Sequence, residues 1–280
     1  MRITVIGARG QLGAAVAEVC RRRHDVVALD RAALDVTQPA RVQAVLTEAR
    51  PDAIINCTSY NFVDAAETHP VDALAVNAVA VRTMARVSAG LNAAFVHYST
   101  DFVFDGRATS PMDEETPPRP CSVYASSKLL GEWLAMQAAP AYVLRVESLF
   151  GEVAGQAPKG SLATIVAALR AGRPARVFRD RTVSPTYVED AAVATVALLE
   201  QRAEPGLYHC VNSGHATWLE VAEEAARLLG LPATLEPTDF ASVPMSAARP
   251  QYCALNNAKL AAAGAPMPSW QNALARYLSR

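Results

Sequence analysis

The chain has 280 residues, of which 51% are hydrophobic and 19% are charged. Its 26 Lys and Arg residues nearly balance its 27 Asp and Glu residues, which gives a formal net charge of -1. This composition excludes a disordered chain, and the lack of surplus positive charge argues against a partner that is DNA or RNA.

Short apolar runs rich in Val and Ile alternate with longer segments of helical spacing in the first half of the chain. We expect strands at residues 2–6, 25–29, 52–56, 93–98 and 141–146, and helices at 11–22, 39–50, 71–90 and 122–137. The strand runs lack polar alternation, which is typical of strands buried on both faces. This order predicts an α/β fold, with a doubly wound parallel sheet of the Rossmann type.

The alternation changes after about residue 150, where a loop rich in Gly, Pro and Ala covers residues 152–160. We expect helices at 162–171, 188–200, 218–229 and 270–279, strands near 176–178 and 206–211, and an irregular Pro-rich segment at 232–250. Residues 1–150 are therefore expected to form the main sheet domain. Residues 186–212 are expected to return to it, and most of 151–280 to form a smaller, interleaved C-terminal domain.

Five cysteines are scattered singly, at positions 20, 57, 121, 210 and 253, without a Cys-x-x-Cys pair. An odd, unpatterned set is typical of reduced thiols, so we expect a cytoplasmic protein. The longest apolar stretch, near residues 191–199, has about half the length that a bilayer requires. We therefore expect no membrane partner.

A glycine-rich turn, Gly7-Ala-Arg-Gly10-Gln-Leu-Gly13, lies between the first expected strand and the first expected helix. Glycine permits a positive φ in such a turn and lets a pyrophosphate approach the backbone closely. The helix that follows presents free N–H groups and the positive end of its dipole to the anion. This pattern predicts that residues 1–150 bind a dinucleotide.

The residues after the second strand address the choice between NADH and NADPH. Asp30 can accept hydrogen bonds from the ribose hydroxyls, which favours NADH, whereas Arg31 or Arg9 can pair with a 2′-phosphate, which favours NADPH. Both arginines fit equally well as solvated surface charges. We expect NADPH or NADH, with the arginines favouring NADPH, and we place Asp35 and Val36 near the adenine.

A proton-transfer pair is expected on the helix at 122–137, because Tyr124 and Lys128 share one helix face at spacing i, i+4. A nearby ammonium favours tyrosinate, so Lys128 is expected to lower the pKa of Tyr124. Tyr124 can then give a proton to a carbonyl oxygen as hydride arrives at the carbon. Ser99 and Thr100 follow the strand at 93–98, where the Thr100 hydroxyl can bind the same carbonyl; the alternative is a polar cap of that strand. For Tyr124 and Lys128 the alternative is a surface i, i+4 contact.

The glycine loop, the stretch Ser-Thr-Asp-Phe-Val-Phe-Asp-Gly at residues 99–106 and the Tyr124/Lys128 pair resemble the extended short-chain dehydrogenase/reductases. More narrowly, they resemble the dTDP-4-dehydrorhamnose reductase family, over nearly the whole chain. The resemblance implies that Thr100 binds the 4-keto oxygen, Tyr124 is the general acid, and Lys128 binds the nicotinamide ribose and tunes Tyr124. It also implies a set of cofactor contacts on the carboxyl side of two strands, made by Gly10, Gln11, Leu12, Cys57, Thr58 and Ser59.

The substrate end departs from the family pattern at several positions. Phe102 replaces a usual Tyr, Asn61 and Phe62 replace a smaller Thr-Ala pair, and Ser148 replaces a Trp that packs on the sugar. We expect a substrate pocket that consists of Thr100, Asp101, Phe102, Asn61, Phe62, Glu147 and Ser148. Glu147 fits an ion-pair partner equally well. Ala15 stands where some members carry a Glu that takes part in bridging a metal, so no metal is expected.

The resemblance implies NAD(P)H-dependent reduction of the 4-keto group of a nucleotide-activated, dTDP-linked 4-dehydro-6-deoxyhexose, in deoxysugar and cell-surface polysaccharide biosynthesis. It leaves the exact sugar open, because the pocket is altered. Two alternatives stay open: another nucleotide-sugar epimerase or reductase of the superfamily, and a non-catalytic dinucleotide-binding regulatory subunit. A nucleotide sugar is the expected partner, most of residues 151–280 is expected to bind it, and a homodimer is left open.

Overall fold

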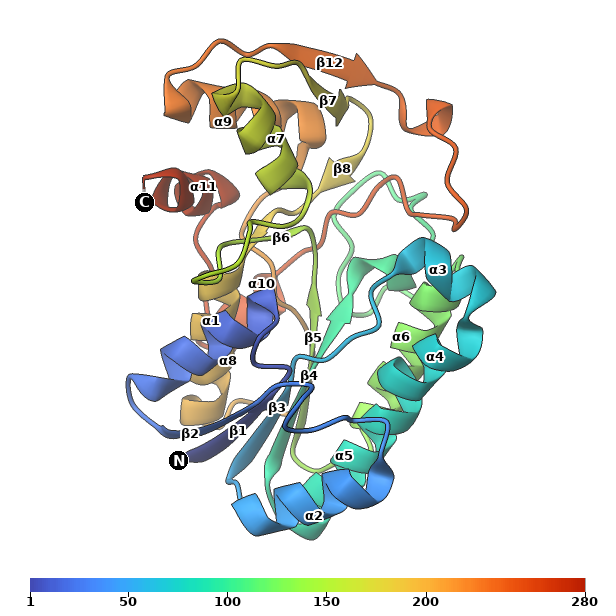
Figure 1. Ribbon diagram of the computed structural model, residues 1–280, viewed down its shortest axis with the longest axis vertical. Helices are drawn as coiled ribbons and strands as arrows, with labels where there is room; N and C mark the ends of the chain where they lie inside the picture. Colours follow the sequence, from blue (N-terminus) through green and yellow to red (C-terminus); the bar gives the residue numbers. More distant parts are fainter. Residues whose placement is uncertain (280) are drawn as a thin grey trace.

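The computed structural model describes residues 1–279, and a six-stranded sheet forms its centre (Figure 1). The strands are β1 (Arg2–Ile6), β2 (Asp25–Leu29), β3 (Ala53–Asn56), β4 (Ala94–Thr100), β5 (Ala141–Val146) and β10 (Gly206–His209). They lie in the order β10-β5-β4-β3-β1-β2, and every neighbouring pair is parallel. The predicted doubly wound parallel sheet is confirmed. The strand order reverses between β1 and β3, so a crevice is expected at their carboxyl ends.

Helices cover both faces of the sheet (Figure 1). On one face, α1 (Gln11–Arg21) packs against α8 (Val188–Gln201); the other face carries α2 (Pro39–Ala49), α5 (Ala80–Gly90) and α6 (Val123–Ala135). Strands β3 and β5 are buried along their whole length, because apolar side chains meet helices on both sides. Within residues 1–279, no helix is both long enough and apolar enough to span a bilayer.

The segment expected as one helix at 71–90 is interrupted. Helix α3 (Val63–Thr68) precedes it, α4 (Pro70–Leu74) begins it, and a π-helical turn η1 (Ala75–Val79) joins α4 to α5. The π turn places the buried side chain of Asn77 against the loop after β3, where its Oδ1 accepts a hydrogen bond from the backbone N–H of Tyr60 at 2.8 Å. Apolar spacing continues through the turn, which explains why the sequence pattern predicts an unbroken helix.

The second half of the chain builds the smaller, upper part of the molecule in Figure 1. It contains α7 (Ser161–Arg170), α9 (Trp218–Leu229), α11 (Trp270–Leu278) and three short strand pairs, whereas α10 (Ala258–Ala262) packs beside strand β10 of the central sheet. The pairs are β6 (Leu149–Phe150) with β9 (Thr186–Tyr187), β8 (Thr182–Val183) with β11 (Ala216–Thr217), and β7 (Ala175–Phe178) with β12 (Leu235–Thr238). The expectation that 232–250 is wholly irregular is wrong. Pro237 fits strand β12 because this strand has only one neighbour, opposite Val177.

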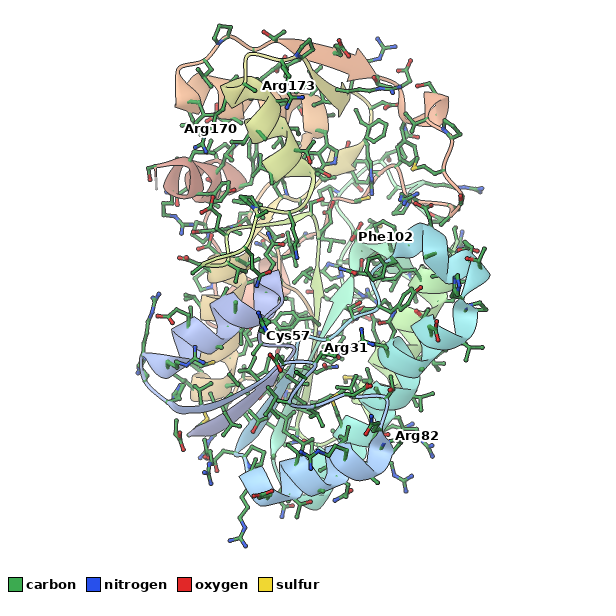
Figure 2. All side chains as sticks on the ribbon, viewed as in Figure 1. Arg31, Cys57, Arg82, Phe102, Arg170 and Arg173 are labelled. Atoms are coloured by element: carbon green, nitrogen blue, oxygen red, sulfur yellow. The ribbon has the colours of Figure 1, made fainter. Side chains whose placement is uncertain are left out.

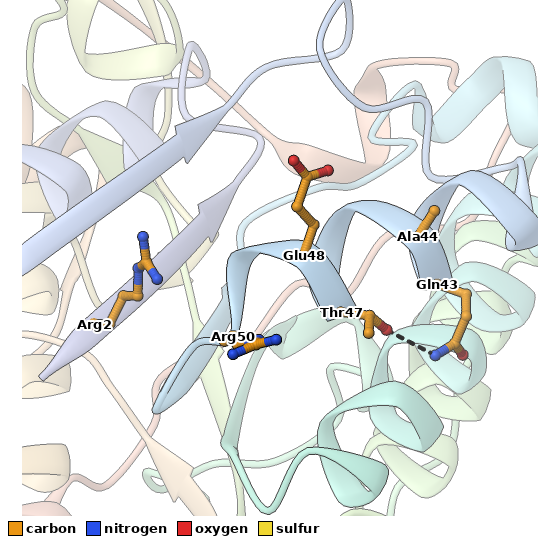
Figure 3. A pocket seen from close by; sticks show the side chains of 6 residues that line it. All are labelled: Arg2, Gln43, Ala44, Thr47, Glu48 and Arg50. Carbon is orange, nitrogen blue, oxygen red and sulfur yellow. Dashed lines mark hydrogen bonds between the residues drawn. The ribbon is translucent and has the colours of Figure 1, made fainter.

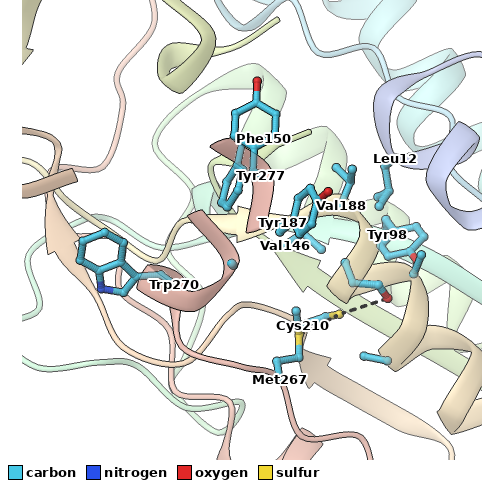
Figure 4. Close-up of a cluster of buried hydrophobic side chains, with 14 of the residues drawn as sticks. Leu12, Tyr98, Val146, Phe150, Tyr187, Val188, Cys210, Met267, Trp270 and Tyr277 are labelled. Carbon is cyan, nitrogen blue, oxygen red and sulfur yellow. Dashed lines mark hydrogen bonds between the residues drawn. The ribbon is translucent and has the colours of Figure 1, made fainter. Parts of the chain in front are cut away.

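An apolar cluster joins the upper part to the sheet (Figure 4). The ring of Phe150 stacks on Tyr187 at 5.3 Å between centroids and meets Tyr277 edge-on at 5.5 Å. The same cluster reaches Ile3 in the sheet and Trp270 in α11. One continuous core therefore spans both parts and packs them together.

Candidate functional site

The glycine turn after β1 has a backbone that side chains would obstruct. Gly7 has a φ of 81°, in the left-handed region that favours glycine. A Cβ at Gly13 would lie 2.2 Å from the carbonyl oxygen of Gly7, so only glycine lets the first turn of α1 pack so closely. Ala14 donates the first helical hydrogen bond, to Gly10, at 2.9 Å. The N–H groups of residues 11–13 therefore lie at the open helix end, and this cradle fits a pyrophosphate.

Two glutamine side chains connect the glycine turn to the segment after β6. Gln11 Nε2 donates to the carbonyl oxygen of Gly151 at 2.8 Å, and Gln156 Nε2 donates to the carbonyl oxygen of Arg9 at 3.0 Å. The side chain of Gln11 is thus engaged with protein, which leaves its backbone N–H for an anion. Leu12 is buried and anchors the start of α1 in the core.

The structure brings Arg9 and Asp30 together at the end of β2. Arg9 Nη1 lies 3.6 Å from Asp30 Oδ2, and Asp30 Oδ1 accepts a hydrogen bond from the Ala33 N–H at 2.9 Å. That backbone N–H is the main cause that lowers the pKa of Asp30, and Arg9 adds to it. Arg31 lies exposed beside them (Figure 2).

The two residues placed near the adenine have local partners. Asp35 Oδ1 accepts hydrogen bonds from the N–H and the hydroxyl of Thr37, at 3.0 and 2.7 Å, and these bonds lower the pKa of Asp35. Val36 is buried in the apolar cluster that also contains Leu34 and Val42. Both residues therefore shape the loop after β2 from within it.

Asparagines that the sequence pattern does not single out hold the loop after β3. Thr58 donates from its N–H and its hydroxyl to Asn56 Oδ1, at 3.0 and 2.6 Å. Ser59 Oγ donates to Asn77 Oδ1 at 3.3 Å, and Asn77 Nδ2 donates to Ser127 Oγ on α6 at 3.0 Å. Asn77 thus ties the expected cofactor loop to the helix that carries Tyr124.

Cys57 begins this loop and lies near the middle of the molecule (Figure 2). Its pKa is raised, mainly because the thiol is desolvated by burial. The side chain is therefore a neutral, apolar wall beside the crevice.

Tyr124 and Thr100 meet at the carboxyl end of β4. The ring of Phe102 packs edge-on against Tyr124, with centroids 5.5 Å apart. Burial is the main cause that raises the pKa of Tyr124 to about 12, while hydrogen bonding to Thr100 and Ser59 acts in the opposite direction. The phenol is thus fully protonated at neutral pH, the form that a proton donor needs.

The expectation that Lys128 lowers the pKa of Tyr124 is wrong for this structure. Lys128 Nζ donates to the carbonyl oxygen of Tyr98 at 2.7 Å, so the ammonium is directed at the end of β4. Lys128 is buried, and burial lowers its own pKa to about 8, although Glu132 one turn along α6 acts in the opposite direction.

A buried ion pair lies one turn of α6 away from Lys128. Arg145 on β5 donates from Nε and Nη2 to the two carboxylate oxygens of Glu132, each at 2.8 Å. Ser99 Oγ also donates to Glu132 Oε1, at 2.5 Å. Arg145 and Glu132 are only 2% and 4% exposed, so β4, β5 and α6 are joined by a fully desolvated network.

Two carboxyl groups are buried beside Thr100. Asp101 and Glu147 follow directly after the paired strand ends Thr100 and Val146. One oxygen from each carboxyl group and Cys253 Sγ lie within 4.8 Å of one another. Glu147 Oε2 accepts a hydrogen bond from the Ser184 N–H at 2.6 Å, and the pKa of each carboxyl group is raised, first by burial.

The remaining expected pocket residues are placed less centrally. Phe62 is 68% exposed and meets Tyr60 edge-on at 5.6 Å, and Asn61 is exposed beside it. Ser148 adopts a φ of 42°, which turns the chain between β5 and β6, and its hydroxyl donates to Glu147 Oε1 at 3.4 Å. Of the expected pocket residues, Thr100, Asp101, Phe102 and Glu147 thus lie close together, and Tyr124 packs against Phe102 beside them.

A shallow hollow lies at the opposite edge of the sheet, where β1 begins and α2 ends (Figure 3). Its wall contains Arg2, Gln43, Ala44, Thr47, Glu48 and Arg50. Ligands of open α/β sheets bind beyond the carboxyl ends of the strands, so this amino-end hollow is separate from the candidate site.

Comparison with known proteins agrees with this geometry. A probable dTDP-4,6-dihydroxy-2-methyloxan-3-one 4-ketoreductase of Streptomyces antibioticus is 36% identical over 98% of this chain and 93% of its own. A dTDP-4-dehydrorhamnose reductase of Mycobacterium tuberculosis is 34% identical over 99% of this chain and 92% of its own.

Solved structures of the same kind superpose closely. The dTDP-4-dehydrorhamnose reductase of Bacillus anthracis, solved in complex with NADP, has a TM-score of 0.93 at 31% identity and covers 99% of this chain and 98% of that one. The family described as RmlD substrate binding domain matches residues 1–280. The chain therefore belongs to the RmlD substrate binding domain family, as its motifs predicted.

Proposed function

We propose that this protein reduces the 4-keto group of a dTDP-linked 4-dehydro-6-deoxyhexose, with NADPH or NADH as the hydride donor. The observation that carries the proposal is the convergence of Thr100, Tyr124 and Lys128 at the carboxyl end of β4, on the same edge of the sheet as the glycine cradle after β1. Relatives that are 34–36% identical over nearly the whole chain bear the names of such reductases.

The protein's own groups supply the proton and the orientation. Tyr124 remains protonated at neutral pH, so its hydroxyl can protonate the oxygen as the carbonyl is reduced. Thr100 is placed to bind the same oxygen. Lys128, held on the Tyr98 carbonyl, brings a positive charge to this end of β4 that stabilises negative charge as it develops.

The residues present fit a dinucleotide. The cradle at Gly7 and Gly13 and the open N–H groups of α1 would hold the pyrophosphate, and Asp30 with Arg9 would face the adenosine ribose. When bound, the nicotinamide supplies the hydride. The exposed guanidinium of Arg31 supports NADPH over NADH, as does the NADP bound in the Bacillus anthracis relative.

Turnover of a defined sugar tests the function. Purified protein is mixed with NADPH or NADH and a panel of dTDP-4-keto-6-deoxyhexoses, with and without a hydroxyl at C2, and loss of nicotinamide absorbance is followed. We expect turnover on at least one sugar and a fall of about 100-fold to 10,000-fold in kcat for Tyr124→Phe. Tyr142→Phe, whose hydroxyl binds the Ala203 carbonyl far from the site, is the matched control.

Cofactor binding without turnover on any keto sugar would contradict the proposal. Binding is measured separately, through quenching of tryptophan fluorescence by NADPH. That result would instead favour a non-catalytic, dinucleotide-binding role.

We also propose that the protein is a cytoplasmic homodimer, in which the upper part of the chain contacts the sugar nucleotide. Helices α4 and α6 pack together and expose large apolar side chains, which include Leu74, Leu130 and Trp133, the last of them 61% exposed. Clusters of this kind mark protein interfaces. All five cysteines are free thiols, which supports a reducing compartment.

A further inference from the structure

The hydroxyl of Thr100 has only one hydrogen to donate, and its neighbours determine which group receives it. Its Oγ1 accepts from the Phe102 N–H at 3.2 Å and lies 3.0 Å from Asp101 Oδ1. If Asp101 is ionised, Thr100 must donate its only hydrogen to that carboxylate. A keto oxygen can only accept, so Thr100 would then have no hydrogen left for the substrate.

The partners of the two carboxyl groups differ in a way that assigns the proton. Glu147 accepts hydrogen bonds at both oxygens, from the Ser184 N–H at 2.6 Å and from the Ser148 hydroxyl at 3.4 Å, which favours the ionised form. Asp101 Oδ2 is buried without a hydrogen-bond partner among the described residues. An unpartnered oxygen favours the neutral acid, because a buried charge there would be unsatisfied.

One cation faces the two carboxyl groups. The guanidinium of Arg181 lies over the ring of Phe102 at 5.8 Å and over Phe240 at 5.4 Å, with Nη2 3.9 Å from Cys253 Sγ. Its charge acts on both Asp101 and Glu147. One cation and two carboxyl groups balance when a single proton is bound, and a second buried negative charge would be unpaired.

We propose that Glu147 is a positioning residue that keeps Asp101 protonated, so that Asp101 donates to Thr100 and Thr100 donates to the keto oxygen. Thr100 Oγ1 then accepts from Phe102 N–H and Asp101 and still has its own hydrogen for the substrate. The titratable or charged groups that face the pair from other elements are Tyr124, Arg181, Tyr252 and Cys253. This inference rests on the proposed reduction only for its effect on turnover.

Infrared spectroscopy tests the bound proton without any substrate. We expect the wild-type protein at neutral pH to show the carbonyl stretch of a protonated carboxylic acid. Both Asp101→Asn and Glu147→Gln should lose it, because the remaining carboxylate is then balanced by Arg181. Glu236→Gln, on the exposed strand β12, should keep it. Absence of the band in the wild type, or its survival in both variants of the pair, would overturn the inference.

The pH profile of kcat tests the consequence for Thr100. Without the charge of Glu147, Asp101 ionises more easily, so Glu147→Gln should lower kcat about 10-fold near neutral pH and move the alkaline limb to lower pH. Asp101→Asn presents a permanent N–H donor to Thr100, so in that background the further change Glu147→Gln should alter neither kcat nor the position of the alkaline limb. Lys128 and Tyr124 titrate in every variant, so a difference between two profiles reports on Asp101 and Glu147.

The two proposals fail in different ways. An equal effect of Glu147→Gln on kcat in the wild-type and Asp101→Asn backgrounds, or identical profiles for the wild type and Glu147→Gln, would refute the positioning role. If no form of the protein reduces any of the sugars while the infrared band behaves as expected, the reductase assignment fails, but the assignment of a bound proton to the Asp101 and Glu147 pair stands.

Discussion

The ammonium of Lys128 donates to the carbonyl oxygen of Tyr98 over 2.7 Å, which fastens helix α6 to the end of strand β4. Tyr98 directly precedes Ser99 and Thr100 in the chain, so the bond holds the cation at this end of β4. Lys128 itself is one helical turn from Tyr124 on α6. Burial lowers the pKa of Lys128 to about 8, and the carboxylate of Glu132 limits the decrease. The ammonium is therefore charged at neutral pH, but at a cost in stability that depends on pH.

The pH dependence of that cost can be predicted with its sign. The pKa of Lys128 is lower in the folded protein than its ordinary 10.5, so the folded state binds this proton more weakly than the unfolded chain. The penalty is complete below about pH 8 and disappears as pH rises to about 10.5. Urea unfolding should therefore show the wild type gaining about 2 kcal/mol over Lys128→Met between about pH 7 and about pH 10.

Other groups titrate over the same range in both proteins, so only the difference between them reports on Lys128. Lys259→Met, at an exposed site on α10, is the control for removing a lysine that is not buried. A pH-independent difference for Lys128→Met would refute the buried, pKa-lowered ammonium.

The Arg145–Glu132 pair should dominate local stability. Glu132→Gln leaves Arg145 charged and unpaired in a dry environment, which should cost about 3 kcal/mol of unfolding free energy. Replacing both residues, as Glu132→Gln with Arg145→Met, should cost less than the sum of the single changes, since no orphan charge remains. Urea midpoints with an unchanged m-value measure this coupling. Additive costs would show that the two groups are not coupled.

The sequence predicts the sheet well because buried parallel strands are uninterrupted apolar runs. The register of β4 on β5 follows from tertiary packing, which no local pattern encodes. The glycine turn and the Tyr124/Lys128 pair were recognisable because each is local, within seven residues of chain.

The residues that sequence reasoning missed are those whose partners are distant. Arg145 reads as an ordinary charge in an apolar strand, and only the packing of α6 brings Glu132 to it. Arg181 and Cys253 reach Asp101 from loops about 80 and 150 positions away along the printed sequence. The prediction of a lowered Tyr124 pKa was wrong for a related reason. Spacing on a helix shows that two side chains share one face, but it does not show that a backbone carbonyl on β4 accepts a hydrogen bond from the ammonium.

Cofactor preference should depend on Arg31. Arg9 is already paired with Asp30, whereas Arg31, the next residue in the chain, is exposed beside the carboxylate that we propose faces the ribose. Arg31→Glu should raise the KM for NADPH by about 10-fold to 100-fold, as expected for loss of a charge-assisted bond to phosphate, and leave the KM for NADH nearly unchanged. Arg82→Glu, on α5 and apart from Arg31 in Figure 2, is the control. Equal KM values for NADPH in the wild type and Arg31→Glu would remove the basis for preferring NADPH.

The exposed apolar side chains of α4 and α6 should set the oligomeric state. Leu130, Trp133 and Met136 recur every three residues on α6, and α4 beside it exposes Val71 at 75%. A charge at the centre of a dimer interface is desolvated without a partner, so Trp133→Glu should convert a dimer into monomers. Sedimentation velocity measures the change, and Val193→Glu, at a site on α8 that is 52% exposed, should leave the dimer intact. A wild type that sediments as a monomer, or dissociation caused by Val193→Glu alone, would show that this face is not the interface.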